Sequence, residues 1–176
     1  MKKRIALLIV TVLILIGCSG VPDGVTVVEG FELERYLGTW YEIARLDHSF
    51  QRGLSRVTAE YSLREDGRID VVNRGYDDAK EQWRSARAVA RPAGDSSVGS
   101  LKVSFFRPFW ADYHIIALDK VDYQYAMVAS SSRGYLWILS RTPTLDETVL
   151  NDLLAKAAAW NYAVDELIYP EHDAEE

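Results

Sequence analysis

Apolar and polar positions alternate along most of this chain with the two-residue period of a β-strand. In residues 54–64 the odd positions from Val57 to Leu63 are apolar, and the even positions between them are polar. The pair Asp66-Gly67 follows, and such a pair favours a tight hairpin turn because it supplies the positive backbone φ angles that the turn needs. Residues 68–76 then alternate again, so this part of the chain predicts an antiparallel hairpin.

The same pattern recurs, with short polar turns between the segments. A first strand is expected after Gly38, and later ones at 83–91, 101–106, 113–118, 123–130 and 135–141. No crossover helix separates them, so the pattern favours an antiparallel meander. Eight strands are enough to close an up-and-down β-barrel whose interior can hold one small ligand. The predicted fold class is therefore all-β.

Periodicity changes to that of a helix after Thr144. Thr144 and Glu147 have the spacing of a capping box, which predicts that the helix begins at Thr144. Its apolar stripe must pack on another surface, most simply the outside of the barrel. The stripe consists of Val149, Leu150, Leu153, Leu154, Ala157 and Trp160. Residues 163–169 predict one further strand before Pro170.

The stretch from Phe31 to Asp47 precedes all of these strands. Its first half predicts one short helical turn, which Gly38 ends. Trp40 follows in a strand and shares the face of Gly38, since alternate strand residues share a face. Glu42 lies on that face too and is expected to point inward.

The N-terminus predicts a targeting segment. Residues 2–4 are basic and residues 5–16 are apolar, a run of 12 that is too short for a stable membrane span. The following Leu15-Ile16-Gly17-Cys18 resembles a bacterial lipobox, in which the cysteine thiol receives a diacylglyceryl group and the chain is cut before it. The alternatives are a plain secretory signal cut near Gly17 or Gly20, and a structural buried cysteine.

This interpretation divides the chain into four parts. They are a signal peptide (1–17), a lipidated tether (18–30), a barrel domain (31–170) and an acidic tail (171–176). By resemblance to enteric lipoproteins, Ser19 in place of an aspartate after the lipidated residue implies the outer membrane of a Gram-negative bacterium. Membrane attachment through Cys18 is thus expected.

Composition narrows the possible partners. The 176 residues suit one domain with a substantial core. The formal charge is −6, and it becomes −9 when the three basic residues of the signal are removed. No basic stripe is present, so nucleic acid is not expected as a partner. Cys18 is the only cysteine, which leaves no disulfide within the chain.

Taken in order, these elements resemble the lipocalin family, and in particular the bacterial outer-membrane lipocalins, over about residues 30 to 170. Gly38-Thr-Trp40-Tyr41 matches the first signature of the family. Asp122-Tyr123 with the following Ala126-Met-Val128 corresponds to the second, and Arg141 to the third. The threonine usual before the aspartate of the second signature is missing, as is the disulfide of many animal lipocalins.

The resemblance implies that Trp40 plugs the closed end of the barrel, that Arg141 packs across its ring, and that both are structural. It also implies a container for a fatty acid or a lysophospholipid, without a cofactor. The inward, ligand-binding positions expected from the family alternation are Ala59, Tyr61, Ile69, Val71, Leu101, Val103, Phe105, Tyr113, Ile115, Tyr135 and Trp137. These side chains would instead form a solid core if the barrel is filled.

Two other functions stay open. One is a lipid-modifying or isomerase-type enzyme, although His48, His114 and His172 are not at metal-ligand spacings and no nucleophile elbow is present. No catalytic or metal-binding residue is therefore assigned. The other is an envelope interaction protein. For it, the aromatic cluster of Phe106, Phe109 and Trp110 would face a membrane or a second subunit in a homodimer, or else pack on its own barrel.

The lipobox interpretation predicts that the Cys18→Ser chain accumulates as an unlipidated precursor, because only the thiol can accept the diacylglyceryl group. Metabolic labelling with radioactive palmitate measures this. Label in the variant equal to that in the parent would contradict the interpretation.

Overall fold

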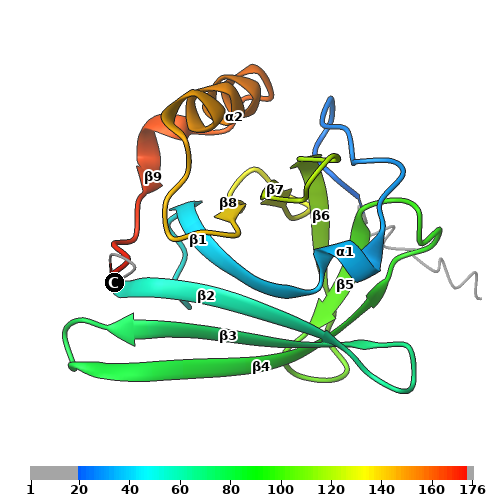
Figure 1. Cartoon of the computed structure of the whole chain (residues 1–176), viewed down its shortest axis with the longest axis horizontal. Helices are drawn as coiled ribbons and strands as arrows, with labels where there is room; N and C mark the ends of the chain where they lie inside the picture. The colour runs from blue at the N-terminus through cyan, green and yellow to red at the C-terminus, as the bar shows by residue number, and fades with distance from the viewer. Residues whose placement is uncertain (1–19, 174–176) are drawn as a thin grey trace, which may run out of the picture.

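The computed structural model describes residues 20–173, and its eight long strands follow one another around a closed antiparallel barrel (Figure 1). β1 closes the barrel because it pairs with both β2 and β8. The fold class expected from the alternation is confirmed. The strands are β1 (Gly38–Leu46), β2 (Leu54–Leu63), β3 (Ile69–Asp77), β4 (Gln82–Pro92), β5 (Ser100–Ser104), β6 (Ala111–Leu118), β7 (Tyr125–Ala129) and β8 (Leu136–Ser140).

Two of the predicted strands differ from those observed. β5 ends at Ser104, so Phe105 and Phe106 belong to the β5–β6 loop. The segment expected as a strand at 163–169 is instead a 3₁₀ turn, η1 (Val164–Glu166), followed by the two-residue strand β9 (Leu167–Ile168). β9 pairs with the end of β1, outside the closed ring of eight strands.

The C-terminal helix α2 spans Glu147–Ala159, and the prediction that Thr144 caps it was wrong. The N-cap is Asp146, whose carboxylate accepts hydrogen bonds from the backbone N–H groups of Thr148 and Val149 at 2.9 and 3.2 Å. A carboxylate satisfies these otherwise unpaired donors and also interacts well with the positive end of the helix dipole. The carbonyl of Thr144 accepts from the hydroxyls of Ser140 and Thr142 instead.

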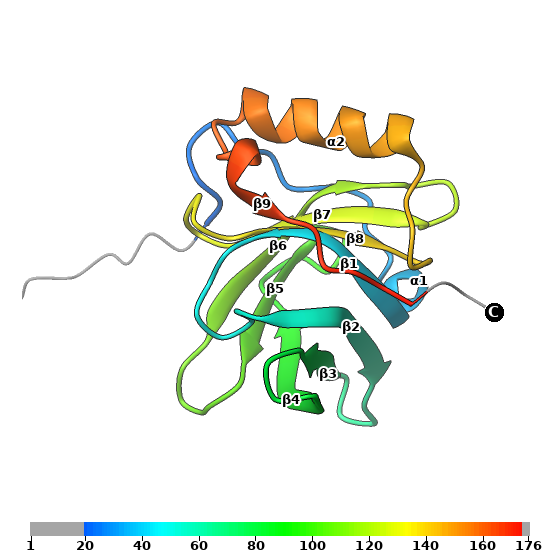
Figure 2. The ribbon, with the colours of Figure 1, turned by 90° about the vertical axis from the view of Figure 1, so that its left-hand side faces the viewer.

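The apolar stripe of α2 covers the outer face of the barrel, as expected (Figure 2). Leu153 and Ala157 are buried there against a cluster that includes Ile116, Met127 and Ile138. Burying a leucine side chain stabilises a fold by about 1.5–3 kcal/mol, so this contact holds the helix in place. Among residues 20–173 no helix has the length and apolarity that a bilayer crossing requires.

Residues 20–30, expected as part of a tether, pack against the barrel instead. Val25 and Val28 are buried. The N–H of Val28 donates to the carbonyl of Ile115 at 2.9 Å, and its carbonyl accepts from Gly99 at 2.8 Å. The segment then enters α1 (Leu33–Tyr36). The first residues of the expected acidic tail are also docked, because Asp173 pairs with Arg56 at 2.7 Å.

Trp40 and Arg141 close one end of the barrel. The indole of Trp40 is fully buried, and its N–H donates to the carbonyl of Tyr36 at 2.8 Å. The guanidinium carbon of Arg141 lies 3.8 Å from the centre of the Trp40 ring. The same guanidinium donates to the carbonyls of Thr39 and Arg35 at 2.8 and 2.7 Å. Arg141 thus joins α1, β1 and the end of β8 in one contact.

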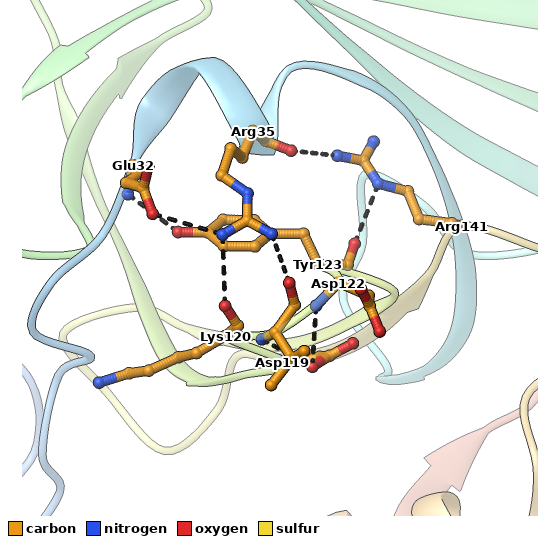
Figure 3. A network of polar contacts seen from close by, with 8 residues as sticks. Glu32, Arg35, Asp119, Lys120, Asp122, Tyr123 and Arg141 are labelled. Atoms are coloured by element: carbon orange, nitrogen blue, oxygen red, sulfur yellow. Dashed lines mark hydrogen bonds and ion pairs between the residues drawn. The ribbon is translucent and has the colours of Figure 1, made fainter.

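Arg35 and Asp119 complete this closed end (Figure 3). Arg35 lies 4.3 Å above the ring of Tyr123 and donates to the carbonyls of Lys120 and Val121. Asp119 accepts hydrogen bonds from the backbone N–H groups of residues 121, 122 and 124. The corner between β6 and β7 is therefore organised by the carboxylate of Asp119, three residues before Asp122.

This arrangement predicts that Trp40→Ala lowers the free energy of unfolding by about 3–5 kcal/mol, since it empties the plugged end. Arg141→Ala is expected to cost less. In the double variant the two costs should not add, because the side chains are in contact. Urea denaturation of the four proteins measures the coupling. Arg141→Lys is the matched control, because it keeps the charge but loses the planar group over the indole. Strictly additive costs would contradict the contact.

Candidate functional site

The interior of the barrel is the candidate site, and its wall is mostly apolar. Nine of the eleven side chains predicted to line it lie in the interior cluster or pack directly against it. They are Ala59, Tyr61, Ile69, Val71, Leu101, Val103, Tyr113, Ile115 and Trp137. On β4 the interior members are Ala88 and Ala90, which shows which face of that strand points inward.

Phe105 and Tyr135, the other two predicted lining residues, lie outside this cluster. Both are in loops, one residue beyond the ends of β5 and β8, and they are 39% and 37% exposed. Strand alternation does not extend to a residue that has left the strand, so the buried interior does not include these two predicted positions. Tyr135 instead stacks near Trp137, with ring centres 6.0 Å apart.

Three phenols form a hydrogen-bonded chain inside the barrel. The hydroxyl of Tyr113 lies 2.7 Å from that of Tyr36 and 2.8 Å from that of Tyr61. Burial raises the pKa of Tyr61 to about 12 and raises the pKa values of Tyr36 and Tyr113 well above the ordinary value. These hydroxyls therefore stay protonated at neutral pH and act as neutral hydrogen-bonding groups.

A bulge in β1 places an ion pair inside the barrel. Strand pairing with β8 shifts between Glu42 and Ala44, so Glu42 and Arg45 both face inward although they are three residues apart. The Arg45 guanidinium donates to the Glu42 carboxylate at 2.6 Å, and both residues are at most 3% exposed. Simple alternation placed Glu42 inside correctly, but it would place Arg45 outside.

Gln51, from the β1–β2 loop, joins this pair. Its amide N–H donates to the second carboxylate oxygen of Glu42 at 2.8 Å, and its amide oxygen accepts from the indole N–H of Trp137 at 3.0 Å. Burial raises the pKa of Glu42, whereas the bonds from Arg45 and Gln51 lower it. Within residues 20–173 the Nε of Arg45 is buried without a hydrogen-bond partner.

His48 lies in the same loop, beneath an aromatic cover. Its ring stacks on Phe50, with centres 3.9 Å apart, and lies 5.2 Å from the ring of Trp137. Removal from water lowers its pKa to about 4, and the nearby charge of Arg45 adds to this. His48 is therefore neutral at pH 7, and both of its ring nitrogens are buried without partners in the described part of the chain.

Accessibility changes along the barrel axis. The paired residues Tyr61, Val71 and Ala88 form a row across β2, β3 and β4, and all are buried. The next row toward the β3–β4 turn is Ala59, Asn73 and Ala86; its first two members are half-buried and the third is exposed. The reachable part of the interior is thus the half that begins at Ala59.

The remaining predicted features lie outside this interior. Cys18 is outside the residues that the structure describes. His114 faces the outer side of β6, where its Nδ1 lies 2.9 Å from the hydroxyl of Ser100, and His172 lies 2.8 Å from the carbonyl of Glu42. Within residues 20–173 no three His, Cys, Asp or Glu side chains are grouped in a way that would hold a metal ion.

Comparison with known proteins finds relatives that are similar to this chain in sequence and in fold. Residues 31–172 match the family described as "Lipocalin-like domain". The chain is 50% identical over 158 residues to "Outer membrane lipoprotein Blc" of Citrobacter freundii, covering 89% of each chain. It is 47% identical to the protein of that name from Vibrio cholerae, covering 94% of this chain and 97% of the relative.

A solved structure with lower identity has the same architecture. The cockroach allergen Per a 4 superimposes with a TM-score of 0.69 over 88% of this chain and 96% of its own, at 19% identity. At that identity the likeness shows the fold alone.

The environment of His48 predicts a pH-dependent stability. Its folded pKa of about 4 lies below the ordinary value of 6.5, so the unfolded chain binds the proton first as the pH falls. The stabilisation is complete above about pH 6.5 and is lost between about pH 6.5 and pH 4. Relative to His48→Phe, which keeps a ring but cannot titrate, the parent should lose about 1–3 kcal/mol over this range. Urea denaturation across the range measures it, and parallel curves for the two proteins would contradict it.

Proposed function

The chain belongs to the lipocalin family, and on this basis we propose that it is a membrane-anchored protein that holds one fatty acid or lysophospholipid in its barrel. In this role it stores or transports the lipid in the bacterial cell envelope. The observation that carries the proposal is the apolar interior, which is plugged by Trp40 at one end and becomes accessible from Ala59 toward the other.

The distribution of polarity suits a lipid with one polar end. An acyl chain gains up to about 0.8 kcal/mol for each methylene that leaves water, and the apolar wall provides that environment. The polar head would remain near the mouth, where the Nε of Arg45 and the ring nitrogens of His48 have no partner among the described residues. Buried polar groups without partners favour a ligand that can hydrogen-bond to them.

The proposed location depends on Cys18. Acylation of its thiol and of the new amino terminus would give more than one acyl chain, which stable membrane attachment requires. The relatives at about half identity carry the printed name "Outer membrane lipoprotein", which supports the same location for this chain.

Binding without chemical turnover is the activity that family membership supports. The relatives' printed name describes a lipoprotein and no reaction. The alternative is an enzyme, in which His48 or His114 would take part in converting the bound lipid. Turnover that stops in His48→Phe would favour that alternative.

A filled barrel that serves as an envelope interaction protein is the second candidate. The full burial of Ile69, Ile115 and Val128 favours it, because these side chains leave little space in the closed half. The two functions differ in whether an acyl chain enters the half that begins at Ala59.

Titration of the chain that begins at Ser19 with a graded series of fatty acids separates these candidates. Affinity should rise with chain length, by up to about 0.8 kcal/mol for each methylene, because each one is buried. Trp137 lies in the wall, so its emission should change on binding, and Trp137→Phe identifies its share of the signal. Calorimetry gives the affinity and the stoichiometry.

Ala59→Trp should fill part of the interior and weaken binding with little effect on the fold. Val103→Trp should also weaken binding, but it is expected to lower stability as well, because Val103 is buried beside Ala90. Glu60→Trp is the matched control, since Glu60 is the next residue on β2 and is exposed on the outer face. Affinity that is independent of chain length, or unchanged in the two interior variants, would contradict the container.

A further inference from the structure

The β5–β6 loop, residues 105–110, exposes two large aromatic side chains that are three residues apart in one turn. Phe106 is 79% exposed and Phe109 is 76% exposed. The N–H of Phe109 donates to the carbonyl of Phe106 at 2.9 Å, which closes the turn that carries both rings. Exposed phenylalanines of this kind mark an interaction surface when they are grouped.

An arginine-lined hollow of about 400 Å³ lies at the base of the same loop. Its walls are Arg68, Arg91, Arg107, Pro108 and Trp110. The guanidinium of Arg91 lies 4.8 Å from the centre of the Trp110 ring. Arg68 pairs with Asp66, but no carboxylate among residues 20–173 lies within 4.0 Å of the Arg91 or Arg107 guanidinium.

The charge of this loop differs from that of the whole chain. The protein carries a formal charge of −6, whereas Arg107 in the loop and Arg91 on the neighbouring strand β4 have no ion-pair partner in the described residues. A second copy of the chain has a net negative charge that could attract the arginines, but no apolar surface on it has been identified that would cover the phenylalanines. Anionic phospholipid matches both parts of the surface, since it offers phosphates to arginine and an apolar layer to phenylalanine.

The start of the described chain lies on the same side of the molecule as this loop (Figure 2). The carbonyl of Asp23 accepts a hydrogen bond from Arg133, in the β7–β8 loop, at 2.6 Å. Cys18 is five residues before Asp23, and five residues span at most about 18 Å. An acylated Cys18 would therefore hold this side of the barrel close to the membrane surface.

We propose that the β5–β6 loop docks on an anionic phospholipid bilayer, with Phe106 and Phe109 among the upper acyl segments and Arg91 and Arg107 on the phosphate groups. This rests on the acylation of Cys18 in the proposed function. Docking turns the loops on this side of the barrel toward the bilayer. The proposed lipid ligand would then have a short path between the bilayer and the barrel interior.

The test uses the full, acylated protein reconstituted into vesicles. Phe109→Cys is labelled with an environment-sensitive fluorophore, and Asp152→Cys is the control because Asp152 is exposed on α2, away from the loop (Figure 2). Vesicles of phosphatidylcholine, with and without phosphatidylglycerol, contain spin-labelled lipids that quench the fluorophore at shallow depth. The label at position 109 should be quenched strongly, and more so with phosphatidylglycerol, while the label at 152 stays unquenched.

The arginines are tested in the Phe109→Cys background. Arg91→Gln and Arg107→Gln should each lower the ratio of docked to undocked protein about fivefold, because each basic side chain near an anionic surface contributes attraction of that size. Lys156→Gln, the same change of charge on α2, should leave the ratio unaltered.

Several results would overturn the proposal. They are equal quenching at positions 109 and 152, equal effects of the three charge variants, and a fluorescence change at 109 that depends on protein concentration but not on the spin-labelled lipid. The last would show association between copies. The fatty-acid titration contains no bilayer, so failure of docking leaves the container function intact, and the reverse also holds.

Discussion

The contact between Arg141 and Trp40 is the constraint on which the rest of the barrel depends. The arginine comes directly after the last strand of the ring and the tryptophan lies in the first, so the contact joins the two ends of the meander. A guanidinium over an indole contributes about 0.5–2 kcal/mol, and here it also donates hydrogen bonds to the carbonyls of Arg35 and Thr39. Gly38, with a φ of +94°, allows the chain to turn from α1 into β1 beside that arginine.

The interior contains two polar clusters that differ in chemistry. The three phenols near the closed end stay neutral because burial raises their pKa values, and they hydrogen-bond to one another. Glu42 and Arg45 form a buried ion pair, and such a pair adds little stability over apolar side chains because both groups lose their hydration. The position of this pair inside the barrel is consistent with a role in binding, as is that of the neutral His48 beside it.

In the proposed function, membrane attachment and lipid binding involve the same side of the molecule. The segment before β1 runs along the barrel from Asp23, beside the β7–β8 loop, to the closed end, where it enters α1. The docked segment therefore leaves a connection of only a few residues to Cys18, shorter than the one expected from composition. A short connection limits how the barrel can be oriented on a membrane, whereas a long one would not.

The sequence by itself determined the fold class, the strand order and the residues that close the barrel. Alternation with period two identifies most strands and the two faces of each, because it depends only on local geometry, but the inner face of the 83–91 strand was decided by the structure. Of the eleven positions expected to face inward from the family alternation, nine lie in the interior cluster, and family signatures identified Trp40 and Arg141. No alternation rule could identify Arg45 as an interior residue, because the bulge that turns it inward arises from pairing between β1 and β8.

Only the tertiary structure decided the remaining features. The packing of residues 20–30 and the gathering of arginines from three separate segments beside Trp110 depend on contacts between residues distant in the chain. The choice of Asp146 over Thr144 as the helix cap depends instead on hydrogen bonds between residues near in the chain, which a spacing rule does not resolve. Phe105 and Tyr135 are exposed because the ends of β5 and β8 are set by neighbouring strands. A local pattern records which face a residue occupies within a strand, but not where its partners allow that strand to end.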